Sequence, residues 1–197
     1  NTLRLNHASA LSNLDLVRDF SGTVVIDKNG LTLDGDLTVN GTLVVNQPFD
    51  VTGDVVVPGY PGVITHDPNI TGSALSIQGD LTIDTGGLLD ISGKGLYPGV
   101  SINAITGQQE SVTVDYSRCG GSHGGMGGCN LESQEREVYG DPRAPVLLGG
   151  GAVTTGWVSG YRVGGSGGGA MRVSATTLLV DGQILANGRD ALNSKSW

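Results

Sequence analysis

The stretch from Leu31 to Gly41 reads LTLDGDLTVNG, and it returns from Leu178 to Gly188 as LLVDGQILANG. Five of the eleven positions are identical, and most of the others keep their apolar or polar character. Each copy holds two short runs of alternating apolar residues, and each run ends at an Asp-Gly or Asn-Gly pair or beside one. Period-two alternation indicates a strand with one buried face, and these dipeptides favour tight turns. The repeat therefore predicts very short strands joined by turns.

The same rhythm continues along most of the chain, with a looser copy of the repeat from Leu81 to Gly93. Short runs rich in Val, Ile, Leu and Thr occur at residues 23–26, 31–33, 37–39, 42–45, 54–57, 74–77, 81–83, 88–91, 111–114, 178–180 and 183–186. Strands this short, each followed at once by a turn, fit a coil that stacks on the coil below it. We therefore predict an all-β fold, a parallel β-solenoid. A β-sandwich or jelly roll is the alternative, since it also has many short strands with turn signals.

Composition divides the chain into four expected segments. Residues 1–20 are expected to form an N-terminal cap, and residues 21–118 the solenoid coils. Residues 119–169 carry 17 of the 34 glycines and are expected to form a glycine-rich excursion from the coil. Residues 170–197 are expected to form the final coil or coils and to continue in a parent protein, because the chain begins without Met and ends without an evident cap. A turn-like motif also recurs, with Tyr60-Pro-Gly-Val63 returning as Tyr97-Pro-Gly-Val100.

Charge and hydropathy exclude several classes of partner. The net charge is −8, and only 15% of the residues are charged. Nucleic-acid binders and proteins that dock on anionic lipid need clustered Lys and Arg, so neither class is expected. No run of 18 apolar residues is present, so no membrane insertion is expected. The expected partners are other domains of the same parent chain and a carbohydrate or cell-surface ligand.

Four glycine-rich blocks follow one another in the second half of the chain. They are CGGSHGGMGG from Cys119, YGDP from Tyr139, LGGG from Leu148 and GGGAMRV from Gly167. Together with the final coil repeat, this order resembles the glycine-rich right-handed parallel β-helix segments of large bacterial secreted or surface proteins, which are adhesin-like. The resemblance covers about residues 81–188. It implies a right-handed coil, an extracellular location, secreted or on the cell surface, and a structural or adhesive role in a larger protein.

The two cysteines, Cys119 and Cys129, flank the first of these blocks. In an exported protein such a pair most simply forms a disulfide that closes the glycine loop. Free thiols stay open, and so does a metal site formed by Cys119, His123 and Cys129. We expect no cofactor, although calcium, with no assignable ligands, stays open for an acidic extracellular β-protein.

Aromatic residues in or beside the glycine-rich region are the candidate binding residues. An exposed aromatic ring flanked by glycine offers a sugar ring a flat apolar platform. The candidates are Tyr116, Tyr139, Trp157 and Tyr161. The competing interpretation is that each ring packs over the solenoid wall.

An enzyme is the alternative class of function, because polysaccharide lyases and hydrolases also use parallel β-helices. Their chemistry needs carboxylates that converge on one face. Asp34 and Asp36 are the one close pair on the predicted coils, and the acidic cluster at 132–141 reads as a solvated face. We therefore expect no catalytic residues and a structural or adhesive module.

Overall fold

The computed structural model contains only strands, turns and extended segments in the part of the chain that it describes. That part comprises residues 2–6, 11–12, 22–103, 108–111, 120–121, 123, 138–141, 143–152, 162–190 and 192–193. Within it, no helix is long and apolar enough to cross a membrane. Two compact units are present. We call Asn1–Ile91 with Met171–Leu185 the coil stack, and Ser92–Ala170 with Ala186–Trp197 the glycine-rich unit.

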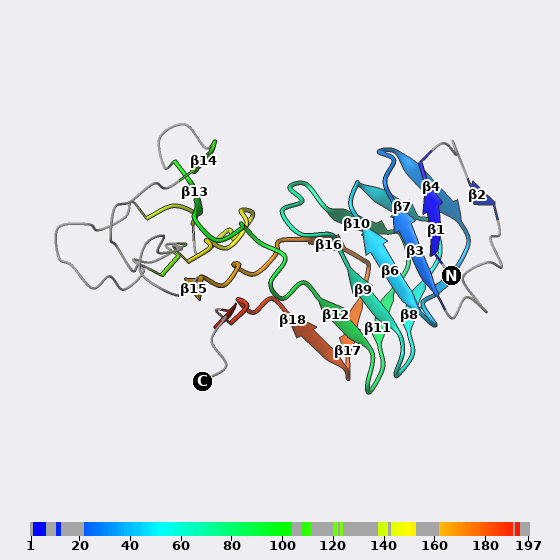
Figure 1. Ribbon diagram of the computed structural model, residues 1–197. Coiled ribbons are helices and arrows are strands. Elements are labelled where there is room, and N and C mark those ends of the chain that lie inside the picture. Colours follow the sequence, from blue (N-terminus) through cyan, green and yellow to red (C-terminus); the bar gives the residue numbers. More distant parts are fainter. Residues whose placement is uncertain are drawn as a thin grey trace. The chain divides into compact units, whose positions relative to one another are not determined.

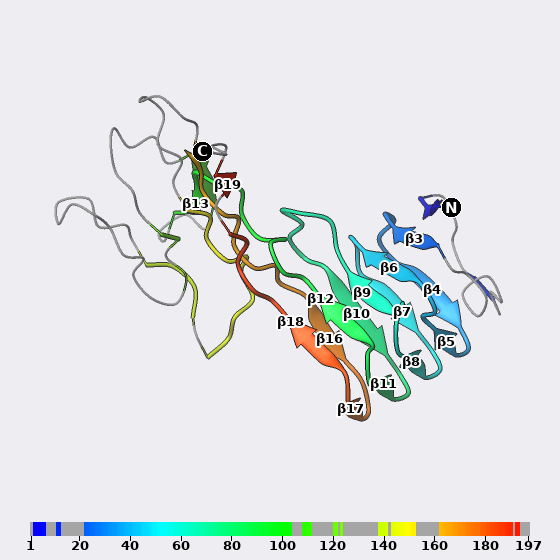
Figure 2. The same ribbon diagram turned by 60° about the horizontal axis from the view of Figure 1, so that its bottom comes forward.

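The coil stack is built from three sheets, and every strand pair in them is parallel (Figures 1 and 2). The first sheet contains β1 (Thr2–Leu5), β3 (Thr23–Ile26), β6 (Thr42–Val45), β9 (Val63–Thr65), β12 (Leu88–Asp90) and β18 (Gln183–Leu185). The second contains β2 (Leu11–Ser12), β4 (Leu31–Asp34), β7 (Phe49–Val51), β10 (Ala74–Ile77) and β16 (Arg172–Ser174). The third contains β5 (Leu37–Thr38), β8 (Val55–Val57), β11 (Leu81–Ile83) and β17 (Leu178–Val180).

From β3 onwards the chain visits the three sheets in turn, so that each circuit lays one strand on the corresponding strand of the circuit before. The prediction of an all-β fold with stacked parallel strands is confirmed, and the arrangement is consistent with a β-solenoid. A β-sandwich or jelly roll needs antiparallel neighbours, which the described strands of the coil stack do not have.

The core of the coil stack consists of side chains at the same position in successive coils. In the third sheet Leu37, Val55 and Leu81 follow one another in register, and all three are buried. The residues between them in each strand point outward, as in Thr38 and Thr82, and are partly exposed. Burying one such aliphatic side chain stabilises a fold by roughly 1.5–3 kcal/mol. The alternation of apolar and polar residues in the sequence thus reflects columns of inward-facing side chains that stack from coil to coil.

The repeat that predicted the fold turns out to mark corners rather than sheets. Its first copy runs from β4 to β5, around the corner between the second and third sheets. Its last copy runs from β17 to β18, around the next corner. The looser copy lies directly beneath that last copy, because Leu81 pairs with Leu178 and Leu88 with Gln183.

The larger segment of the glycine-rich unit, Ser92–Ala170, is inserted in one coil of the stack. The segments that lead from the first sheet to the second are residues 27–30, 46–48 and 66–73 in three successive coils, and residues 91–171 in the next. The stacked strands thus stop at residue 90 and resume at 172, whereas the excursion was expected at 119–169. The first strand after the interruption, β13 (Val100–Ile102), pairs antiparallel with β14 (Gln109–Ser111).

At the N-terminal end the described residues extend the stack. Strand β1 pairs in parallel with β3, and β2 pairs in parallel with β4. Residues 7–10 and 13–21 lie outside the described part, so the cap over this end stays a prediction.

Backbone contacts between glycine segments hold the described part of the glycine-rich unit together. Leu96 N–H donates to Gly149 O at 3.0 Å, Gly149 N–H to Gly168 O at 2.8 Å, and Gly167 N–H to Leu96 O at 3.2 Å. A Cβ atom built on Gly167 would lie 2.0 Å from Gly149 O, so only glycine allows this approach. A small core and one further antiparallel pair, β15 (Arg162–Val163) with β19 (Leu192–Asn193), complete the described part.

Candidate functional site

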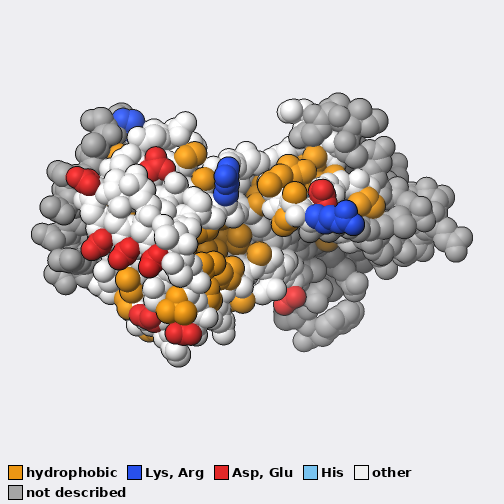
Figure 3. Space-filling view, turned by 180° about the vertical axis from the view of Figure 1, so that it is seen from behind, with side chains coloured by type: hydrophobic (Ala, Val, Ile, Leu, Met, Phe, Trp, Pro, Cys, Tyr) orange, Lys and Arg blue, Asp and Glu red, His pale blue; other side chains and the backbone are white. Residues whose placement is uncertain are grey.

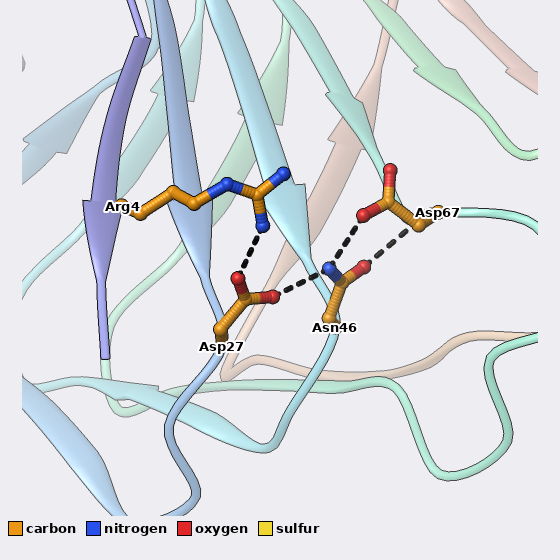
Figure 4. A network of polar contacts seen from close by, with 4 residues as sticks. All are labelled: Arg4, Asp27, Asn46 and Asp67. Atoms are coloured by element: carbon orange, nitrogen blue, oxygen red, sulfur yellow. Dashed lines mark hydrogen bonds and ion pairs between the residues drawn. The ribbon is translucent and has the colours of Figure 1, made fainter.

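A column of polar side chains runs along the end of the first sheet (Figure 4). Strands β3 and β6 end in register, so the residues that follow them, Asp27 and Asn46, stack on each other. Asn46 Nδ2 donates to Asp27 Oδ1 at 2.7 Å and to Asp67 Oδ2 at 2.8 Å, and Asn46 Oδ1 accepts from the Asp67 N–H at 2.8 Å. Arg4 of β1 forms an ion pair with Asp27. Four consecutive coils are thereby joined.

Every polar group of the Asn46 amide is used in this column. Asn46 is buried, and its hydrogen bond to Asp27, together with Arg4, lowers the pKa of that carboxyl below its usual value against a smaller effect of burial. Hydrogen bonding to the charged form of an acid favours that form. One neutral amide thus joins two carboxylates from neighbouring coils, which suits a structural contact between coils better than proton transfer.

A second column of aspartates lies at the corner between the second and third sheets. Asp36 Oδ1 accepts from the Asp54 N–H at 2.9 Å, and Asp54 Oδ1 accepts from the Asp80 N–H at 2.9 Å. Gly53 and Gly79 leave the space for these carboxylates, since a Cβ atom on Gly53 would overlap Asp36 Oδ1. Acidic side chains lie in a row along the coil stack in the space-filling view, as stacked corners require (Figure 3).

The carboxylate pair considered for catalysis is thus engaged in contacts between coils. Asp36 accepts the Asp54 N–H, and Asp34 Oδ1 accepts a hydrogen bond from Thr52 Oγ1 at 2.9 Å. Both partners belong to the next coil. The acidic residues at 132–137 lie outside the described part of the chain.

No group of three or more His, Cys, Asp or Glu side chains in the described part is arranged to hold a metal ion. Cys119 and Cys129 lie outside that part, so the disulfide, the free thiols and the Cys119–His123–Cys129 site all stay predictions. His123 is described. Its ring lies 5.2 Å from the ring of Tyr139, and its Nε2 is buried without a hydrogen-bond partner among the described residues.

Of the four predicted binding aromatics, the structure places Tyr139, and it places that ring in the core. Tyr139 is buried, its Oη donates to Leu148 O at 2.9 Å, and burial raises its pKa to about 12. A ring in this position offers no face to a ligand, so the assignment of Tyr139 as an exposed platform is corrected. Tyr116, Trp157 and Tyr161 lie outside the described residues, and their role stays a prediction.

The exposed tyrosines of the described part are Tyr60 and Tyr97, which sequence reasoning did not select. Tyr60 is 91% exposed and Tyr97 is 48% exposed. Both belong to the repeated Tyr-Pro-Gly-Val motif, which predicts a turn. The signal that could have found Tyr60 is an aromatic residue set between Gly and Pro at a coil corner.

The last coil of the stack leaves its inward column uncovered. Leu178 and Val180 are 53% and 38% exposed, whereas Leu81 and Ile83 beneath them are 1% and 0% exposed. Ile184 of β18 is likewise 49% exposed. Hydrophobic side chains gather near this last coil in Figure 3. Half-exposed apolar side chains at the end of a stacked column are typical of a terminal repeat that no further repeat covers.

Comparisons of the chain with protein-family models, curated proteins and solved structures gave no match.

Proposed function

We propose that this chain is a structural and adhesive module, a right-handed parallel β-helix within a larger secreted or cell-surface protein. The handedness and the location come from the resemblance of the glycine-rich blocks to adhesin-like proteins. In this role the coil stack is a rigid spacer, and the glycine-rich unit is carried by one of its coils.

The observation that carries the proposal is how the polar residues of the coil stack are used. The carboxylates of Asp36 and Asp54 bind backbone N–H groups of the next coil, and Asn46 joins Asp27 to Asp67. Polar side chains that bind the neighbouring coil add stiffness to the stack. This use favours a load-bearing or presenting role.

Two further features support the proposed partners. The half-exposed column at Leu178, Val180 and Ile184 is suited to contact with other domains of the same parent chain. The exposed ring of Tyr60 is suited to contact with a carbohydrate or another cell-surface ligand.

The spacer role is tested by replacing residues 92–170 with a short turn copied from residues 46–48, which make the same connection in an earlier coil. If the coil stack is a self-supporting scaffold, the amides of β3 to β12 keep their protection from hydrogen exchange. Loss of protection throughout these strands would contradict the proposal. The protection of the same amides in the intact chain serves as the reference.

A polysaccharide lyase or hydrolase is the alternative function. It needs acidic groups that are free to act on a substrate, and Asp34 and Asp36 are bound to the neighbouring coil instead. Release of new reducing ends from a polysaccharide panel, abolished by changing Glu132, Glu135 or Glu137 to Gln, would favour the enzyme over the spacer.

A further inference from the structure

We propose that the corner between β8 and β9 is a binding site for neutral polysaccharide, with the ring of Tyr60 as the platform on which one sugar ring stacks. This inference rests on the adhesive part of the proposed function and names its site and ligand class. The site belongs to the coil stack, and it includes none of the residues selected from the sequence.

The first support is the exposure of the ring in a firmly held corner. Tyr60 is 91% exposed, so nearly all of its aromatic surface is in water. The backbone beneath it is tightly packed, because Gly62 N–H donates to Gly59 O at 3.1 Å and a Cβ atom on Gly59 would lie 2.7 Å from Thr85 O. An exposed ring on a fixed backbone binds with little loss of conformational entropy.

The second support is the residue stacked on Tyr60 in the next coil. Gly86 occupies that position, with φ +88°, and a Cβ atom there would lie 3.3 Å from the Tyr60 N. The nearest atoms to such a Cβ belong to the backbone of Gly59 and Tyr60, so a larger residue would crowd the backbone that carries the ring. With glycine at this position the neighbouring corner adds no side chain next to the backbone of Tyr60.

The third support is the set of polar groups on the adjoining corners. The Asp84 N–H donates to Val57 O at 3.0 Å and the Asp181 N–H to Ile83 O at 2.8 Å, so these two residues stack in line beside the corner of Tyr60. Thr85, which is exposed, precedes Gly86. Carboxylate and hydroxyl groups next to an aromatic platform accept and donate hydrogen bonds to sugar hydroxyls.

The negative charge around Tyr60 bears on which class of polysaccharide can bind. The three stacked corners, residues 58–62, 84–87 and 181–182, contain Asp84 and Asp181 but neither Lys nor Arg. The whole chain carries a net charge of −8. Like charges placed together disfavour binding. Polymers of uronic acids are therefore disfavoured, and neutral polysaccharides are the ligand class that fits this charge.

The test is affinity electrophoresis of the intact chain in gels that contain galactomannan, xyloglucan or mixed-linkage β-glucan, with polygalacturonate as the anionic comparison. We expect retardation by at least one neutral polymer and none by polygalacturonate. Tyr60→Ala is expected to weaken the retarding interaction about tenfold, which corresponds to ~1.4 kcal/mol. Tyr60→Phe keeps the ring and is expected to keep the retardation.

Tyr97→Ala is the matched control, because Tyr97 stands in the same Tyr-Pro-Gly-Val motif in the glycine-rich unit. It is expected to behave like the unchanged chain. Absence of retardation in every neutral gel would overturn the inference, as would equal retardation of the intact chain and Tyr60→Ala. Either result leaves the spacer role to the separate hydrogen-exchange test, so the two proposals fail independently.

Discussion

At the scale of single residues, the coil stack depends on polar side chains that reach from one coil to the next. The Asp54 N–H donates to the carboxylate of Asp36, and the Asp80 N–H donates to that of Asp54. The sequence separations differ from coil to coil because the corners differ in length. Such contacts have no fixed spacing, which is why the repeat could not reveal them.

Replacing Asn46 with Asp is expected to destabilise the coil stack by about 1–3 kcal/mol at pH 7, because a third carboxylate would replace the donor shared by Asp27 and Asp67. The loss should shrink on acidification, when one protonated carboxyl can again donate. Urea unfolding at pH 7 and near pH 4 measures both effects. Asn29→Asp, in an exposed turn, is the control and should change little. An equal loss at both pH values would contradict this account of the column.

In the unchanged protein the pKa of Asp27 is lowered by folding. The ionised carboxylate therefore contributes stability above the pKa that it has in the unfolded chain, and this contribution is lost as the pH falls through its folded value. Asp27→Asn should remove that part of the acid dependence. Unfolding free energies compared between pH 5 and pH 2 test this, and an unchanged pH dependence would count against the ion pair and amide contact.

At the scale of strands, an inward-facing side chain contributes most to stability where the next coil covers it. Alternation in the sequence predicts ten strands of the coil stack, namely β3, β4, β5, β6, β8, β10, β11, β12, β17 and β18. From β3 onwards it misses β7 (Phe49–Val51), β9 (Val63–Thr65) and β16 (Arg172–Ser174) in the coil stack. Their partners in the adjacent coil, and not their own sequence, make these segments strands.

Leu89 and Ile184 occupy the same column in successive coils, but Leu89 is 4% exposed and Ile184 is 49% exposed. Leu89→Ala is expected to cost about 2–5 kcal/mol, as for other buried aliphatic truncations. Ile184→Ala should cost roughly half as much, because half of that side chain is already in water. Chemical unfolding of the two variants measures both losses. Similar losses would mean that the end of the stack is covered in solution.

At the scale of the whole molecule, the chain consists of a coil stack and a second unit, which is formed by the segment Ser92–Ala170 inserted between β12 and β16 together with Ala186–Trp197. The boundary at Ser92 was not predicted, since Leu88–Ile91 continues the strand rhythm and the glycine content rises only later. The candidate site shows the same limit. Glycine content directs attention to the aromatics of the second half, while the most exposed tyrosine of the described part, Tyr60, stands at a corner of the coil stack.

Gly167→Ala is expected to loosen the glycine-rich unit, because the added Cβ would overlap Gly149 O. Amides of residues 93–99 and 147–152 should exchange faster, while those of the coil stack stay protected. Gly188→Ala is the control, since its Cβ would meet only Ser166 O, at 3.5 Å. Faster exchange throughout both units would show that they unfold together.

The central claim is that successive coils stack with parallel strands in register, and nuclear Overhauser contacts between backbone protons test it most directly. In the third sheet Val56 pairs with Thr38 on one side and with Thr82 on the other, and Thr82 pairs in turn with Leu179. The account predicts a series of parallel interstrand contacts through residues 38, 56, 82 and 179. Close Hα–Hα contacts between strands adjacent in sequence, such as β5 and β6, are the mark of antiparallel pairing and would contradict it.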